Sequence, residues 1–325
     1  MSTPVKPIQE FGATSQRALE NFDEQYSAAL VSMPAVWTSI LGDVISGGSL
    51  KDTYPVALNA LKYRLDAGKP TTFDTKVKEI SIVKRTFSAG AEAEAKRIRL
   101  GDFAYSRTWS MTPAAMARAR MFLHNRLVAD ALEANATCFD GVAFFSASHP
   151  VNAFDSSIKY HSSATWSNLQ SVATPLTEAN LTQEKAAFKM TPGPDGEELG
   201  LEPTHVLVPT SLDDKAYNMI SVQDLITSGS TNTTGTVRNP HFKSGIVNVR
   251  APELAGTDTT ANWYLVSLTM PDIIPWILSE GDEELLTYDE SSDYYKDTGR
   301  IKVVSKLDIE AALVHPHCIR KITGA

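Results

Sequence analysis

The sequence predicts an α+β fold, in which helices and strands follow one another in no regular order. A strong helical pattern covers residues 113–135, and short apolar runs bounded by turn residues recur from residue 204 onward. No internal repeat is visible, and the two kinds of element do not alternate strictly. This mixed order argues against a parallel sheet built from repeated strand–helix–strand units.

Composition indicates a globular protein. The chain has 325 residues, of which 42% are hydrophobic and 21% are charged, enough for one large domain or two modest ones. No apolar run approaches the roughly 20 residues that span a bilayer. The opening MSTPVKPIQEFG lacks an apolar stretch behind a basic start, so we expect no secretory signal and a protein kept in the cytosol. Two cysteines are too few for a disulfide framework or a four-cysteine zinc cluster.

Charge is unevenly distributed along the chain. The formal net charge of −8 argues against a protein that grips phosphates, because such proteins carry a basic stripe. Residues 69–107 nevertheless hold nine basic and five acidic side chains, and residues 280–293 hold seven acidic side chains and no basic one. These segments are either two solvated surfaces or a basic projection of one subunit that meets an acidic patch on its neighbour.

The first predicted element is a helix over residues 14–31. Its apolar residues recur at steps of three and four and form one stripe: Leu19, Phe22, Tyr26 and Leu30. Thr14 or Ser15 is suited to cap its start. A helix with a single apolar stripe must dock on its own body or on another subunit.

Residues 65–110 predict a long hairpin. A strand-like run contains Val77, Ile80 and Ile82, the segment SAGAEAEA interrupts the pattern, and a second run extends from Ile98 to Trp109. The apolar content is thin for a core element. Such a hairpin is either a marginal loop or an arm that awaits a partner.

The clearest helix covers residues 113–135. Thr112 is suited to cap its start, Pro113 fits the first turn, where its missing N–H costs nothing, and Asn135 ends it. At 1.5 Å per residue the helix is a rod of roughly 34 Å. It is therefore long enough to act as a spine.

The remaining elements are shorter. We expect helices at 178–190 and at 211–226, the latter capped by Ser211, with a turn-rich loop at 192–200 and a flexible polar loop at 227–236. Strands are expected at 204–209, 244–250, 262–268, 300–304 and 309–314.

Enzyme signatures are weak. The chain has no phosphate-binding glycine loop, no dinucleotide fingerprint, no HExxH and no nucleophile elbow. Cys138, Asp140 and His149 lie close in sequence and suggest a cysteine nucleophile with a histidine base. The simpler interpretation is a buried thiol and a histidine ordered by the proline that follows it. We favour this second interpretation and predict no catalytic residue.

A metal site is also considered and set aside. His315 and His317 would share one face of a strand next to Cys318, but no close fourth ligand of the right kind is evident. The acidic run 280–293 lacks the alternating Asp/Asn pattern of a calcium loop. We therefore predict no metal, no cofactor and no enzymatic activity.

The segment DGVAFFSASHP at residues 140–150, directly after the long helix, resembles the major capsid proteins of tailed phages, and most of all the Mu-like major head subunit family. Three further stretches strengthen the resemblance, which covers roughly residues 110–325. They are residues 180–220, the segment NWYLVS at 262–267, and the closing segment GRIKVVSKLDIEAALVHPHCIRKI.

The resemblance implies the fold named after phage HK97. The expected parts are an N-terminal arm at 1–64, an extended E-loop at 65–110, a P-domain at 111–159 and 271–325 that contains the spine helix, and an A-domain at 160–270.

It also implies a function. Copies of the chain would self-assemble into hexamers and pentamers of an icosahedral shell that encloses double-stranded DNA without sequence-specific binding. The expected location is the virion after assembly in the host cytoplasm, with scaffold, portal and decoration proteins as partners and no membrane. The alternatives are the shell of an encapsulin-like nanocompartment and a cytosolic cysteine hydrolase.

Overall fold

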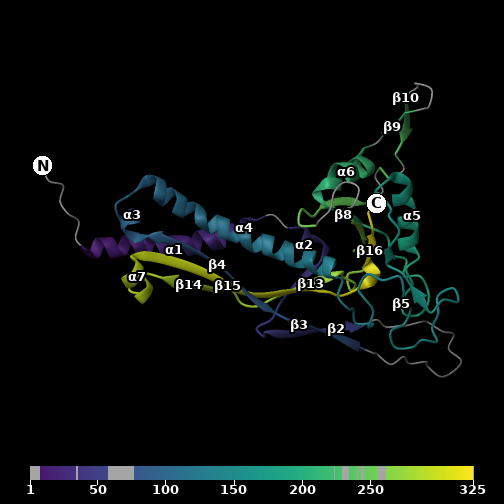
Figure 1. Ribbon diagram of the computed structural model, residues 1–325, viewed down its shortest axis with the longest axis horizontal. Helices are drawn as coiled ribbons and strands as arrows, with labels where there is room; N and C mark the ends of the chain where they lie inside the picture. Colours follow the sequence, from purple (N-terminus) through teal and green to yellow (C-terminus); the bar gives the residue numbers. More distant parts are fainter. Residues whose placement is uncertain are drawn as a thin grey trace.

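The computed structural model describes residues 8–33, 36–57, 77–222, 224–228, 234–239, 241–242, 245–254 and 261–324. The fold is α+β, as predicted. Figure 1 shows an elongated molecule, with long helices over a sheet in one part and a second sheet flanked by shorter helices in the other. None of the helices in the described ranges has the length and apolar character that crossing a membrane requires.

The first sheet is built around one long strand, β15 (Arg300–Leu313). On one side β15 pairs with β13 (Trp276–Glu280) and β14 (Glu284–Tyr288), and on the other with β4 (Arg85–Glu94), always antiparallel. β1 (Asp43–Ser46) extends the sheet parallel to β13. The sequence predicted two strands in place of β15. One strand forms because alternate residues from Ile301 to Ile309 are buried without interruption.

The spine helix α4 (Phe103–Ala134) lies along one face of this sheet (Figure 1). The predicted end at Asn135 is confirmed, with Asn135 in the left-handed conformation. The predicted start was wrong, because the helix begins ten residues before Pro113 and is capped by Asp102. Pro113 costs the helix one backbone hydrogen bond, and the burial of Trp109 in the core beside it offsets this cost.

The helix α1 (Ile8–Ser32) confirms the helix predicted at 14–31. The predicted start was wrong, because the helix begins at Ile8 and Thr14 and Ser15 lie inside it rather than at its cap. Leu19, Phe22 and Tyr26 are buried, and Leu30 is half-buried. The stripe packs on α4 and β15 of the same chain, with the Phe22 and Trp109 rings 5.2 Å apart. The sequence left open whether this helix docks on its own chain or on another subunit. The structure shows that its apolar stripe docks on its own chain. Helix α2 (Trp37–Leu41) follows and leads into β1.

The hairpin predicted at 65–110 was wrong in its strands. The hairpin in the structure joins β2 (Lys51–Ala57) to β3 (Val77–Val83), and residues 65–76 of the prediction lie outside the described residues. The segment SAGAEAEA forms most of β4, and α3 (Ala95–Arg99) and α4 follow it. Small side chains suit β4, because its alternate alanines fit beneath the helices while β15 supplies the backbone ladder.

The second sheet has the order β11 (Val247–Arg250), β8 (His205–Val208), β12 (Trp263–Val266), β16 (Ile319–Ile322) and β7 (Leu169–Gln170). Helices α5 (Glu178–Lys189) and α6 (Asp213–Ser221) pack beside it (Figure 1). The predicted strands at β8, β11 and β12 and the helix at α5 are confirmed. Smaller elements include the two-stranded pair of β5 (His149–Pro150) and β6 (Thr165–Trp166) and the helix α7 (Asp293–Thr298).

The helix predicted at 211–226 was too long. It ends at Ser221, and β9 (Asp224–Ser228) follows and pairs with β10 (Thr234–Arg238). Ser211 does not cap it, because Ser211 lies in the 3-10 turn Thr210–Leu212. The ends of the loop predicted at 227–236 thus belong to a hairpin, and residues 229–233 lie outside the described residues.

Candidate functional site

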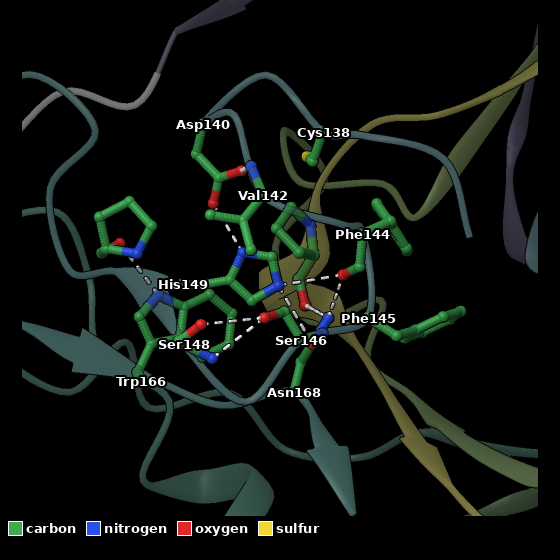
Figure 2. A network of polar contacts seen from close by, with 12 residues as sticks. Cys138, Asp140, Val142, Phe144, Phe145, Ser146, Ser148, His149, Trp166 and Asn168 are labelled. Atoms are coloured by element: carbon green, nitrogen blue, oxygen red, sulfur yellow. Dashed lines mark hydrogen bonds and ion pairs between the residues drawn. The ribbon is translucent and has the colours of Figure 1, made fainter. Parts of the chain in front are cut away.

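The structure brings Asp140 and His149 together in a buried polar network (Figure 2). His149 Nδ1 lies 2.6 Å from Asp140 Oδ2. His149 Nε2 faces two acceptors, the Phe144 carbonyl oxygen at 3.1 Å and Asn168 Oδ1 at 3.2 Å, so this nitrogen carries a proton and donates it. Burial is the largest single influence on the pKa of Asp140 and acts to raise it, but the hydrogen bonds from His149 and from the Val142 N–H, with the electrostatic interaction with His149, together outweigh burial and lower the pKa.

Cys138 is not part of a catalytic pair. Its Sγ donates to the Val314 carbonyl oxygen at 3.7 Å, and both nitrogens of His149 are engaged elsewhere (Figure 2). Burial raises the pKa of the Cys138 thiol to about 12, which disfavours the thiolate that a nucleophile requires. The arrangement supports the interpretation of a buried thiol beside an ordered histidine.

His315, His317 and Cys318 are buried around the 3-10 turn Pro316–Cys318. Burial lowers the pKa of His315 to about 4 and that of His317 to about 3. The His317 ring stacks on Trp166 at 4.5 Å, and Trp166 stacks on His149 at 5.0 Å. Within the described ranges no three His, Cys, Asp or Glu side chains converge in a way that would hold a metal ion. These residues therefore belong to the core.

Part of the acidic run 280–293 is used inside the chain. Arg120 of α4 donates to both Glu280 and Glu283, and Tyr26 and Ser305 also donate to Glu283. These hydrogen bonds and ion pairs connect α1 and α4 to the sheet around β15. Basic side chains of the segment 69–107 also form ion pairs within the chain. Arg97 pairs with Asp102 and Lys84 pairs with Asp52, each at 2.8 Å. Arg99 lies 3.7 Å from Glu290, so the two charged segments meet within one subunit.

The β2–β3 hairpin has one buried face and one exposed face. Val56 and Ile82 pack on Ile277 and Val314 of the body. The opposite face carries Lys51, Thr53, Pro55, Val77, Glu79, Ser81 and Val83, all exposed. Nothing in the described part of the chain covers these residues, and apolar Val83 is 62% exposed. This face is therefore a candidate contact surface.

Two grooves among the described residues do not bring catalytic groups together. A groove of about 370 Å³ between α4, β3 and β15 is lined mainly by alanine and larger apolar side chains, and the Arg85 and Glu310 side chains at its rim are paired with each other. A second groove of about 220 Å³ between α1, α4 and β4 contains Arg120, which Glu280 and Glu283 already occupy.

Comparison with known proteins agrees with this picture. A family model described as phage capsid protein matches residues 87–322. No curated protein matches the chain by sequence.

Two solved structures share the fold. A chain of the procapsid of bacteriophage JBD30 has a TM-score of 0.51 and 15% identity, over 99% of this chain and 77% of that chain. A chain of the capsid of the empty GTA particle has a TM-score of 0.51 and 12% identity, over 90% of this chain and 92% of that chain. The HK97-like fold implied by the sequence resemblance is confirmed. Assignment to the Mu-like subfamily stays a prediction.

Proposed function

The chain belongs to the phage capsid protein family, and from this membership we propose that it is the major capsid protein of a tailed phage. The observation that carries the proposal is the extent of the family match, which runs from β4 to β16 and so includes the strands of both large sheets except β1. The family gives the chain a structural role and not an enzymatic one. Its copies form hexamers and pentamers of an icosahedral shell around double-stranded DNA.

The shape of the subunit supports this proposal. A shell subunit needs contact areas larger than those of a transient complex, and each contact joins two different surfaces of neighbouring copies. The exposed face of the β2–β3 hairpin is suited to such a contact, because it presents Val77, Pro55 and Val83 on a projecting element whose backbone is already ordered. A neighbouring copy would bury these side chains.

The domain division follows from the same proposal, with one change. The arm contains α1, the P-domain contains α4 and the sheet around β15, and the A-domain contains the sheet around β8. The E-loop is the β2–β3 hairpin and not the segment 65–110, because β4 is a strand of the P-domain sheet.

The proposed setting is the virion, reached after assembly in the host cytoplasm. Scaffold, portal and decoration proteins are the proposed partners, and no membrane is involved. The net charge of −8 supports a wall that encloses DNA without binding it tightly, since phosphate repels acidic side chains. An encapsulin-like compartment is the alternative within the same fold. Nucleic acid inside the particles would favour the phage shell, and an enzyme cargo would favour the compartment.

Expression of the chain, alone and with a phage scaffold protein, tests the proposal. We expect closed particles in electron micrographs and a fast-sedimenting species in the ultracentrifuge. Val83→Asp should lower the particle yield by about tenfold, because a charge cannot be buried at the contact without a partner, while Val83→Thr should retain most of it. A subunit that stays monomeric under every condition would contradict the proposal.

A further inference from the structure

The outward face of α4 carries a regular stripe of exposed side chains. Steps of four, four, three, four and four residues separate its members, which therefore lie on one side of the helix. They are Arg107, Met111, Ala115, Arg118, Phe122 and Arg126, and every one of them is exposed. Met111 is 61% exposed and Phe122 is 63% exposed, although the opposite side of the helix already fills the core.

The composition of this stripe is that of a protein interface. Arginine, methionine and aromatic residues are enriched at interfaces relative to the rest of the surface, and lysine, acidic residues, serine and alanine are depleted. Five of the six stripe residues are arginine, methionine or phenylalanine, none is lysine or an acid, and Ala115 is the one member of a depleted type. A helix with apolar residues on two sides is normally covered on both. The stripe therefore indicates a partner surface over the outer side of α4.

The partner must be acidic. Arg107 and Arg118 have no carboxylate partner among the residues that the structure describes, and Arg126 lies 3.9 Å from Asp130 of its own helix. The partner must also offer apolar contacts, because Met111 and Phe122 separate the arginines. A phosphate backbone supplies charge without that apolar surface, so the pattern favours a protein over DNA.

A second copy of the chain has such a surface. Asp282, Asp289 and Asp297 are exposed around β14 and α7, and none of the three forms an ion pair with a described cation. Leu286 and Tyr288 of β14 are half-buried beside them. In Figure 1, α4 and α7 lie on opposite sides of the same long half of the molecule. Opposite charges on opposite flanks are what a head-to-tail contact between identical subunits requires.

We propose that the α4 stripe of one subunit docks on the acidic β14–α7 flank of a neighbouring subunit. The proposal rests on the proposed function and identifies one of the contacts that build the shell. In this contact Arg107 and Arg118 pair with Asp289 and Asp297 of the neighbour, while Met111 and Phe122 contact the apolar side chains of β14. The charges fix which surfaces meet, and the apolar side chains supply most of the buried area.

A charge-exchange experiment tests the contact. The double variant Arg107→Glu/Arg118→Glu should lower particle yield by at least about tenfold, because it places acid against acid. The variant Asp289→Lys/Asp297→Lys should do the same by placing base against base. All four substitutions in one chain should restore the yield to within about threefold of the original chain. Restoration would also show that the double variants fold.

A control variant changes the charge of the chain away from both proposed contact surfaces. Lys159→Glu changes the net charge as much as Arg118→Glu but lies on an exposed loop away from both surfaces, so it should leave assembly unchanged. Normal assembly of the double arginine variant would overturn the proposal, as would failure of the four-substitution chain to recover, which would point to DNA or another protein as the partner. Failure of the original chain to form particles would count instead against the proposed function.

Discussion

His149 Nδ1 lies 2.6 Å from Asp140 Oδ2, and this pair joins the turn after α4 to the short strand β5. The Asp140 carboxylate is only 4% exposed, so it depends on its hydrogen bonds with His149 and with the Val142 N–H. We expect His149→Ala to lower the free energy of unfolding by about 3 kcal/mol, because it leaves a buried charge unpaired. The melting temperature of particles measures the effect. Equal melting of the variant and the original would contradict this prediction.

Acid should destabilise the protein below about pH 6.5. Burial holds the pKa of His317 at about 3 and that of His315 at about 4, whereas unfolded histidine titrates near 6.5. Between these values the unfolded chain takes up protons that the folded chain does not, so stability is complete above about pH 6.5 and falls as the pH falls. The lowered pKa of Asp140 removes further stability at still lower pH.

His317→Phe should reduce the loss of folding stability as the pH falls. Neither ring nitrogen of His317 has a hydrogen-bond partner in the described part of the chain, so phenylalanine removes a titrating group and keeps the stacking on Trp166. Melting curves of both proteins across pH 7 to pH 4 provide the measurement. Parallel curves would show that His317 does not contribute.

Cys138 should react slowly with thiol reagents while the protein is folded. With a pKa of about 12, roughly one Cys138 thiol in ten thousand is ionised at pH 8. Cys318 is also buried, and burial raises its pKa. Titration with a chromogenic disulfide should detect both thiols only after denaturation. Cys138→Ala should assemble normally, whereas loss of a hydrolytic activity in this variant would revive the cysteine hydrolase alternative.

Arg120 should be essential for attachment of the helices to the sheet around β15. Its guanidinium binds Glu280 and Glu283, and all three side chains are mostly buried. Arg120→Met keeps the length of the side chain but leaves two carboxylates without their cation, which should cost about 3 kcal/mol.

Exposed Lys189 is the matched control for Arg120, because it lies outside both proposed contact surfaces. Its one ion pair is with exposed Glu202, so Lys189→Met should change stability by less than about 0.5 kcal/mol. Thermal unfolding of the two variants in the same assembly state gives the comparison. Equal losses would mean that the buried cluster contributes no more than a surface pair.

Gly42 should not tolerate a side chain. A Cβ atom at this position would lie 2.8 Å from the Trp276 carbonyl oxygen and closer still to the Trp276 ring. Gly42→Ala should therefore cost about 1–3 kcal/mol through overpacking. Gly48 has no atom within 4 Å of the same hypothetical Cβ, so Gly48→Ala is the control and should be close to neutral. Soluble yield and melting temperature test the pair.

Elements with an apolar pattern of their own were predictable from sequence. The stripe of α1 and the helix α5 have a helical periodicity, and the strands β8 and β12 are short continuous apolar runs, so each is identified locally. The small residues of β4 have no such pattern, since the strand depends on β15, more than 200 residues later in the chain. Pro113 was misleading because proline usually marks a helix start, and here Trp109 holds the preceding turn in place.

The functional surfaces were less predictable. Cys138 and His149 are close in sequence but face different partners, which spacing alone does not reveal. The basic and acidic segments do meet, but within one subunit, as the contact of Arg99 with Glu290 shows. Their expected contact between subunits stays a prediction. The α4 stripe is visible in the sequence only once the start of the helix is placed at Phe103, because Arg107 and Met111 precede Pro113.

The position of β15 at the centre of its sheet also limits when a subunit becomes complete. A nascent chain on the ribosome has already released β1, β4 and α4 before it reaches residue 300, yet none of these can close the sheet without β15. A prematurely terminated polypeptide is therefore left with open strand edges and an uncovered core. We expect such fragments to be bound by chaperones or degraded by proteases, because they expose apolar surface and unpaired strand edges.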